Sequence, residues 1–346
     1  MYLSLNTAPR ILDELCHLTA QSLTSLDPSD HFQVLKLLGE GSYGKVMLAL
    51  HKKRGTPMAL KYFPRDSTSL LSFLREYNLS LAYCTHPSLT SALGIVFSTP
   101  THYVFAQQPS LYGDLYDVIV PEVGLKESCV QRVVSQVSGA LSHLHSLGFV
   151  HRDVKPENIF LCDRDCRWVK LGDFGMVKAV GTRVPCVWYS SPYCTPEAEV
   201  VRQKETSDSG SSYVDTNGNQ KLVDNENSSK KRTLVLVEPS TDSWALGILI
   251  YAMLMGTLPW TESVLDNVAY NRYFRWSERE RMANEDSRSD GFKHYDHAAP
   301  QFTAFTPLAC SLFQALLHPK PKLRATPGDV PAYLGGAWKL TGEISG

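Results

Sequence analysis

The pattern of apolar residues changes near residue 107, and this change limits the chain to a fold in two parts. Before that point the sequence predicts mostly strands, with one helix at 69–83, and after it the apolar residues fall mostly at helical spacing. Strands gathered on one side of a boundary and helices on the other are typical of the α+β class. The sequence therefore predicts a small β-rich lobe followed by a larger, mostly helical one.

Two helices of the second half are the clearest. The first spans 127–147, with Gly148 after it as a C-cap. Its apolar residues at helical spacing are Val130, Val133, Val134, Val137, Leu141 and Leu144. The second, "TDSWALGILIYAMLMG", opens on Thr241 as a capping residue and is apolar all round, so we expect it to be buried on every side. Its apolar run, Trp244 to Met255, is shorter than the roughly 20 residues that cross a bilayer.

Composition excludes some classes of partner. With 43% hydrophobic and 10% aromatic residues, the chain can build a substantial core. Its 34 basic and 35 acidic residues create no field suited to nucleic acid or to a membrane surface, so we expect neither partner.

The N-terminal residues 1–30 form an extension with one weakly amphipathic run, which predicts a short docked helix. No basic region followed by a long apolar run is present, and the eight cysteines lack regular spacing. These features predict reduced thiols in the cytoplasm. Cys162 and Cys166 lack the second Cys or His pair of a zinc site, which favours a hairpin between two strands.

Residues 202–232 interrupt the pattern, because they contain few sizeable apolar side chains. Such a segment cannot bury enough surface to offset the cost of ordering, so we expect disorder. It is either a regulatory loop or an error of the gene model. The basic "KKR" at 230–232 is either a solvated charge cluster or a signal that allows nuclear access.

Four short stretches of the sequence contain candidate functional residues. "LGEGSYGKV" places Gly39, Gly41 and Gly44 between two strands, where glycines let backbone amides approach a phosphate, although a tight hairpin explains them equally well. Lys61 ends an apolar strand and needs an anionic partner, which Glu76 can supply from the following helix, as a structural salt bridge or as part of a site. "HRDVKPENIFL" and "KLGDFGMVK" follow the long helix.

Taken in order, these motifs resemble those of the eukaryotic protein kinases, and "GEGSYGKVMLALHKKRGTPMALK", "YVFAQ" and "VEPSTDSWALGIL" resemble the SH3-binding-domain kinase family. The resemblance spans about 31–338, with an N-lobe at 31–107, a C-lobe at 108–338, the insertion at 202–232 and a tail at 339–346. It implies the bilobal kinase fold and a kinase that uses ATP and Mg²⁺.

The resemblance also implies roles for single residues. Asp153 would accept or orient the proton of the substrate hydroxyl, Lys155 would steady the transferring phosphoryl group, and Asn158 and Asp173 would hold Mg²⁺. In "YVFAQQPSLYGDLYD", Gln107 would be a polar gatekeeper at the back of the adenine pocket. Gln108 would be the first residue of the hinge between the lobes. The residues expected at ATP are Leu38, Gly39, Glu40, Gly41, Ser42, Tyr43, Gly44, Lys45, Val46, Ala59, Lys61, Glu76, Gln107 and Gln108.

Protein serine and threonine hydroxyls are the expected acceptors, because "DVKPEN" resembles the Ser/Thr kinases and "TPE" resembles their peptide-docking ledge. A pseudokinase that acts as a binding scaffold would lack at least one of four residues. These are Lys61, Asp153, Asn158 and Asp173, and all four are present. A small-molecule kinase of similar fold is disfavoured by the full activation segment. No two of the 20 prolines are three residues apart, so no PxxP motif supports an SH3-domain partner.

The resemblance assigns two structural contacts. It also assigns two positions in the activation segment, which runs from Asp173 to Glu197. Asp242 would bond the backbone of the catalytic loop, and Arg324 would pair with Glu197. Ser190 would contact the catalytic Asp and Lys. Cys186 occupies the site where related kinases carry a phosphorylated Thr, so we expect either Thr182 or no phosphosite to take over.

Overall fold

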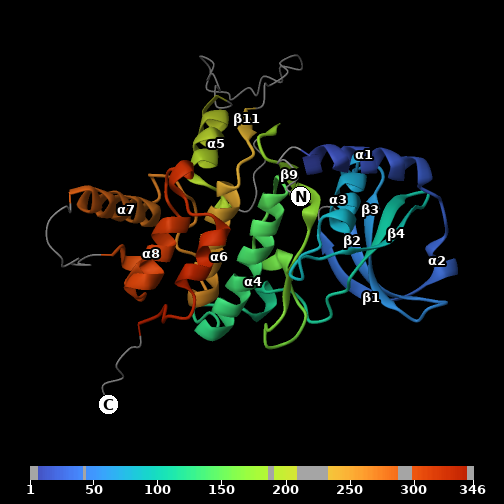
Figure 1. Cartoon of the computed structure of the whole chain (residues 1–346), viewed down its shortest axis with the longest axis horizontal. Coiled ribbons are helices and arrows are strands. Elements are labelled where there is room, and N and C mark those ends of the chain that lie inside the picture. Colours follow the sequence, from blue (N-terminus) through green and yellow to red (C-terminus); the bar gives the residue numbers. More distant parts are fainter. Residues whose placement is uncertain (1–6, 42–43, 186–190, 209–232, 287–297, 341–346) are drawn as a thin grey trace, which may run out of the picture.

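The computed structural model describes residues 7–41, 44–185, 191–208, 233–286 and 298–340. A sheet with the first three helices of the chain forms one part, and the later helices form the other (Figure 1). The sheet is antiparallel, with the spatial order β1 (Phe32–Gly41), β2 (Gly44–His51), β3 (Pro57–Pro64), β5 (His102–Gln107) and β4 (Ala92–Ser98). The predicted α+β fold, with its β-rich N-terminal lobe and helical C-terminal lobe, is confirmed.

The alternation of side chains along β3 gives the sheet two different faces. Met58 and Leu60 point into a small core formed only within the sheet, while Ala59, Lys61 and Phe63 point to the opposite face. That opposite face packs against α3 (Leu70–Ala82), which Ser69 caps by accepting a hydrogen bond from the backbone N–H of Ser72 at 3.1 Å. The period of two therefore directs Lys61 toward the helix, as the sequence predicts.

The predicted docked helix of the extension is confirmed as α1 (Thr7–Ser22). It lies along α3 at the edge of the β-rich lobe (Figure 1). Its buried residues Ala8, Leu12 and Cys16 join the large hydrophobic core, and the hydroxyl of Tyr83 donates to the Ala8 carbonyl at 3.0 Å. The extension is thus packed into the lobe.

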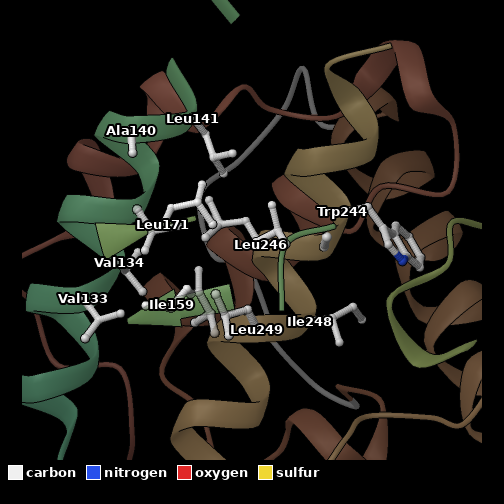
Figure 2. Packing of buried hydrophobic residues seen from close by; sticks show 14 of the residues in the cluster. Val133, Val134, Ala140, Leu141, Ile159, Leu171, Trp244, Leu246, Ile248 and Leu249 are labelled. Carbon is white, nitrogen blue, oxygen red and sulfur yellow. The ribbon is translucent and has the colours of Figure 1, made fainter. Parts of the chain in front are cut away.

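The C-terminal lobe is built around α4 (Glu127–Ser146) and α6 (Ser240–Met255). Both contribute to one hydrophobic cluster, in which residues of β7 (Ile159–Leu161) and β8 (Val169–Leu171) lie between them (Figure 2). All six apolar residues predicted on one face of α4 are fully buried, and α6 is buried on nearly every side, as expected. Gly256 ends α6 with φ 67, in the left-handed region. The predicted cap Thr241 is wrong: the helix starts one residue earlier, and Pro239 is the N-cap, without a side-chain hydrogen bond.

Shorter elements complete this lobe. The short strands pair as β6 (Phe149–Val150) with β9 (Lys178–Ala179), β7 (Ile159–Leu161) with β8 (Val169–Leu171), and β10 (Arg183–Pro185) with β11 (Leu234–Leu236). The other helices of this lobe are α5 (Pro196–Asp208), α7 (Val268–Asp286) and α8 (Pro307–Leu316). The short helix α2 (Pro28–His31) belongs to the β-rich lobe, where it leads into β1. The β7–β8 pair confirms the hairpin predicted around Cys162 and Cys166. No helix among the described residues is long and apolar enough to cross a membrane.

The prediction of disorder over 202–232 is wrong for residues 202–208, which form the second half of α5. Helical spacing could not reveal this, because this half of the helix carries few apolar residues. Arg202, within it, pairs with Glu262 at 2.8 Å. Residues 209–232 lie outside the described part, and Leu234–Leu236 after them pair with the activation segment.

Candidate active site

Three charged side chains from distant parts of the sequence meet between the lobes. The ammonium of Lys61 on β3 lies 2.5 Å from Oε1 of Glu76 on α3 and 3.0 Å from Oδ1 of Asp173, which follows β8. Lys61 and Glu76 are mostly buried, whereas Asp173 is partly exposed. Burial favours the neutral form of Lys61, but the two carboxylates outweigh it and raise the pKa of Lys61 above its usual value.

Asp173 is affected in the opposite direction. Burial acts to raise its pKa, but the charge and hydrogen bond of Lys61 outweigh this and lower it. Its backbone is left-handed, with φ 59, which is uncommon for a residue other than glycine. At neutral pH this cluster therefore has one fixed cation between two carboxylates, one of which is accessible to a ligand.

The catalytic loop holds Asp153, Lys155 and Asn158 together. The amide of Asn158 donates to Asp153 twice, to its Oδ2 at 2.8 Å and to its backbone carbonyl at 2.7 Å. The ammonium of Lys155 lies 3.0 Å from Asp153 Oδ2. Burial acts to lower the pKa of Lys155, but the bond and charge of Asp153 outweigh it and raise it. Because both donated bonds use its nitrogen, Asn158 keeps its amide oxygen for other ligands.

Asp242 on α6 fixes the start of this loop, as predicted. Its Oδ2 accepts from the backbone N–H of His151 at 2.8 Å and its Oδ1 from that of Arg152 at 2.7 Å. His145 of α4 contacts the same carboxylate at 2.8 Å. These partners lower the pKa of Asp242 against the effect of its complete burial. They support the left-handed backbone of Arg152, with φ 69.

The predicted pair between Arg324 and Glu197 is also confirmed. It is bidentate, with 2.7 Å and 2.6 Å between the guanidinium nitrogens and the two carboxylate oxygens. Arg324 also stacks on the ring of Trp244, with 4.8 Å from its guanidinium carbon to the ring centre. The pair joins the end of the activation segment to the core of the lobe.

A separate cavity of about 170 Å³ opens beside β3 and the hinge. Six of the residues expected at ATP line it: Leu38, Gly39, Val46, Ala59, Gln107 and Gln108. The buried Oε1 of Gln108 has no hydrogen-bond partner among the described residues. A ligand in this cavity that carries an N–H donor can satisfy that acceptor.

Glycine has a different role at each position of the first hairpin. A Cβ on Gly39 or Gly41 would meet nothing within 4 Å, whereas one on Gly44 would lie 1.9 Å from the Tyr62 carbonyl oxygen. Gly44 also has φ 132. Its requirement for glycine is therefore set by packing on β3, and only the first two glycines leave open space of the kind that a phosphate needs.

Other predicted positions lie elsewhere or outside the described residues. Glu40, Gly41, Gly44 and Lys45 form the β1–β2 turn region, where Glu40 pairs with Lys45 across the strands, and they do not line the 170 Å³ cavity. Ser42, Tyr43, Cys186 and Ser190 fall outside the described residues. The carbonyl of Thr182 accepts from Val237 N–H at 2.9 Å.

Sequence reasoning missed Thr90 and Phe160, which also line the cavity. A Cβ on Gly172 would lie 2.7 Å from both side chains, so this glycine lets them close the cavity floor beside Asp173. Thr90 follows an unpatterned loop and carries no motif. Phe160, two residues after Asn158, was within reach, because the strand alternation places it opposite the buried Ile159.

Comparison with known proteins agrees with this geometry. The protein kinase domain family matches residues 32–214. Serine/threonine-protein kinase SBK1 of Danio rerio is 38% identical over 332 residues, covering 96% of this chain and 75% of the relative. Serine/threonine-protein kinase SBK2 of Rattus norvegicus is 33% identical over 333 residues, covering 96% and 81%.

The chain therefore belongs to the protein kinase family. Within this family, its similarity is to the serine/threonine-protein kinases of the SBK group. The predicted resemblance to a Ser/Thr-type eukaryotic protein kinase is confirmed.

Proposed function

We propose that this kinase transfers the γ-phosphoryl group of ATP to serine or threonine hydroxyls of protein substrates, using Asp153, Lys155, Asn158, Asp173 and Lys61. The contact of Lys61 with both Glu76 and Asp173 carries the proposal. It joins a strand, a helix and the metal-binding motif in one charged site, and the phosphate chain of ATP needs such a site.

The cavity beside the hinge suits the adenine of ATP. Val46 and Ala59 supply apolar surface, and Gln107 and Gln108 supply polar groups at its edge. The Oε1 of Gln108, which has no partner in the described part of the chain, can accept a hydrogen bond from an exocyclic amine. Lys61, fixed as a cation, would then bind the α- and β-phosphates, with Glu76 orienting it.

The catalytic loop would act on the acceptor hydroxyl. Asp153 would accept or orient its proton, and the bonds from Asn158 hold this carboxylate in one position. Lys155, now 3.0 Å from Asp153, would bind the transferring phosphoryl group. Ser190 would support both from the activation segment.

The carboxylate of Asp173 and the amide oxygen of Asn158 are the kinds of ligand that Mg²⁺ prefers, so the residues present fit this ion. When bound, Mg²⁺ would neutralise charge on the β- and γ-phosphate oxygens. We place the enzyme in the cytoplasm, with protein substrates as its partners. In an alternative form of this proposal, residues 230–232 act as a signal that gives it access to the nucleus.

Transfer of radiolabel from [γ-³²P]ATP to a library of Ser- and Thr-containing peptides tests the function. The wild-type chain should label peptides in the presence of Mg²⁺, and Asp173→Asn, which keeps the size of the side chain, should lose at least about 100-fold in rate. Equal labelling by both chains, or none by the wild type, would contradict the proposal.

A further inference from the structure

Two cysteines outside the active site lie on neighbouring elements of the C-terminal lobe. Cys129 lies in the first turn of α4, and Cys166 lies in the loop between β7 and β8. The Sγ of Cys129 contacts the backbone carbonyl of Asp165, the residue directly before Cys166, and this brings the two thiols together. Cys129 is partly exposed and packs against the hydrophobic cluster that contains Cys166. The side chain of Cys166 is only 3% exposed.

The contact is held in place by bonds on both sides of it. Arg132 of α4 donates to the Asp165 carbonyl at 3.1 Å, and the Gln136 amide donates to the Arg167 carbonyl at 3.1 Å. The Sγ of Cys129 itself lies 4.0 Å from the Asp165 carbonyl oxygen. These bonds tie α4 to the hairpin one residue before and one residue after Cys166.

The hairpin is ordered from within as well. The carboxylate of Asp163 accepts from the backbone N–H groups of Asp165 at 2.9 Å and Trp168 at 2.9 Å. Cys166 has a left-handed backbone, with φ 52. Its thiol is therefore kept inside, against α4, rather than turned to solvent.

The two thiols differ in reactivity. The hydrogen bond from Cys166 and the charge of Arg132 outweigh partial burial and the nearby carboxylates of Asp163 and Asp165, and they lower the pKa of Cys129 to about 7. Cys166, as the donor, has its pKa raised. At neutral pH Cys129 is thus a partly ionised, accessible thiol with a second thiol directly behind it, the arrangement of an attacking and a resolving cysteine.

We propose that Cys129 and Cys166 form a reversible redox pair, in which a hydroperoxide oxidises Cys129 and Cys166 then closes a disulfide between α4 and the β7–β8 hairpin. The thiolate of Cys129 attacks the terminal peroxide oxygen, the O–O bond breaks, and a sulfenic acid forms as hydroxide leaves from hydrogen peroxide, or alkoxide from an organic hydroperoxide. The thiol of Cys166 attacks the sulfenic sulfur, the S–O bond breaks, and its proton leaves with the hydroxide as water. Small thiols reverse the reaction by exchange.

The new bond would link α4 to the hairpin whose strands lead from Asn158 and toward Asp173. It closes a loop of chain between two parts that already touch, so it stabilises mainly by restricting the unfolded state. We expect the melting temperature of the oxidised chain to exceed that of the reduced chain by roughly 5 °C or more.

Peptide mapping of the full chain after treatment with hydrogen peroxide tests the proposal. We expect a peptide linked through Cys129 and Cys166 under non-reducing conditions, a loss of two titratable thiols per chain, and reversal by dithiothreitol. The rate of thiol loss should rise from pH 6 to pH 8 and then level off, as Cys129 ionises.

Variants separate this pair from general oxidation. Cys129→Ser should abolish the linked peptide and the rise in melting temperature, whereas Cys162→Ser, an exposed cysteine of the same hairpin, should leave both unchanged. Because Cys129 is only partly buried, this serine variant should fold. A sulfinic or sulfonic acid at Cys129 with Cys166 still reduced, or a disulfide through Cys162, would overturn the proposal.

Discussion

The guanidinium of Arg75 on α3 donates to the carboxylate of Asp13 on α1, with 3.0 Å between Nη2 and Oδ1. Glu76, the next residue of α3, contacts Lys61 of the site. The N-terminal extension therefore binds the helix that orients the central lysine of the site. Because the ion pair is largely exposed, its own contribution to stability is small, and the apolar residues of α1 supply most of the attachment.

This attachment predicts that Leu12 matters for both stability and activity. Leu12→Ala removes a side chain that is 6% exposed, and we expect a loss of about 2–4 kcal/mol in the free energy of unfolding. Looser packing of α3 should also lower kcat. Denaturant unfolding and a peptide kinase assay measure the two effects. Leu18→Ala on the same helix, where the side chain is 60% exposed, is the matched control and should change neither.

The buried Asp242 predicts a dependence of stability on pH. Asp242→Asn removes the charge that holds His145 and two backbone amides, and we expect a loss of about 3–5 kcal/mol at pH 7. The pKa of Asp242 is lower in the folded state than the usual 3.8, so its contribution is complete above pH 3.8 and declines as pH falls below it.

The difference in stability between the wild type and Asp242→Asn should therefore narrow as pH falls below 3.8. Unfolding in urea at pH 7 and at pH 3.5 measures this difference. Asp266→Asn, at an exposed position, should show no such change. A difference that stays constant with pH would mean that the charge of Asp242 does not stabilise the loop.

The bidentate pair of Arg324 predicts that lysine cannot replace it. Lysine keeps the charge but offers a single ammonium, so Arg324→Lys loses one of two bonds to Glu197 and the stacking on Trp244. We expect a loss of about 1–3 kcal/mol in thermal unfolding measurements. Arg167→Lys, where the arginine forms an exposed ion pair with Asp165, should stay within about 0.5 kcal/mol of the wild type.

The glycines of the first hairpin should respond differently to alanine. Gly44→Ala forces a Cβ toward the Tyr62 carbonyl at φ 132, so we expect a lower melting temperature. Gly39→Ala meets nothing in the protein but adds a methyl group to the 170 Å³ cavity proposed to bind adenine, so we expect normal stability and a several-fold higher KM for ATP. Calorimetry and steady-state kinetics separate these outcomes. Equal melting temperatures for the two variants would contradict this account.

Local patterns predicted the parts of the site that depend on short stretches of sequence. Helical spacing located α4 and α6, and strand alternation directed Lys61 toward Glu76. By resemblance, the motifs at Asp153 and Asp173 placed the catalytic loop and the residues that we propose to hold Mg²⁺. The contacts of Asp242 with the catalytic loop and of Arg324 with Glu197 were also predicted from the resemblance to protein kinases. Nothing in the local sequence indicates which distant groups will pair.

What remained beyond prediction depends on packing between distant segments. The docking of α1 was expected, but not that it binds α3 through Asp13 and Arg75. The contact of Cys129 with Cys166 needs the relative placement of a helix and a hairpin, which spacing cannot give. Thr90 lines the 170 Å³ cavity from a loop without periodicity. Likewise, the second half of α5 has too few apolar residues for its helical form to be apparent.

The pairing of β10 with β11 explains how this kinase accommodates so long a connection before α6. Because Leu234–Leu236 bond to Arg183–Pro185, the chain re-enters the folded lobe at a fixed point, whatever length precedes it. Once both ends of a loop are fixed, doubling its length costs only about 0.6 kcal/mol of closure entropy. The connection between α5 and β11 can therefore gain or lose residues over evolutionary time without displacing α6, or the carboxylate of Asp242 that supports the catalytic loop.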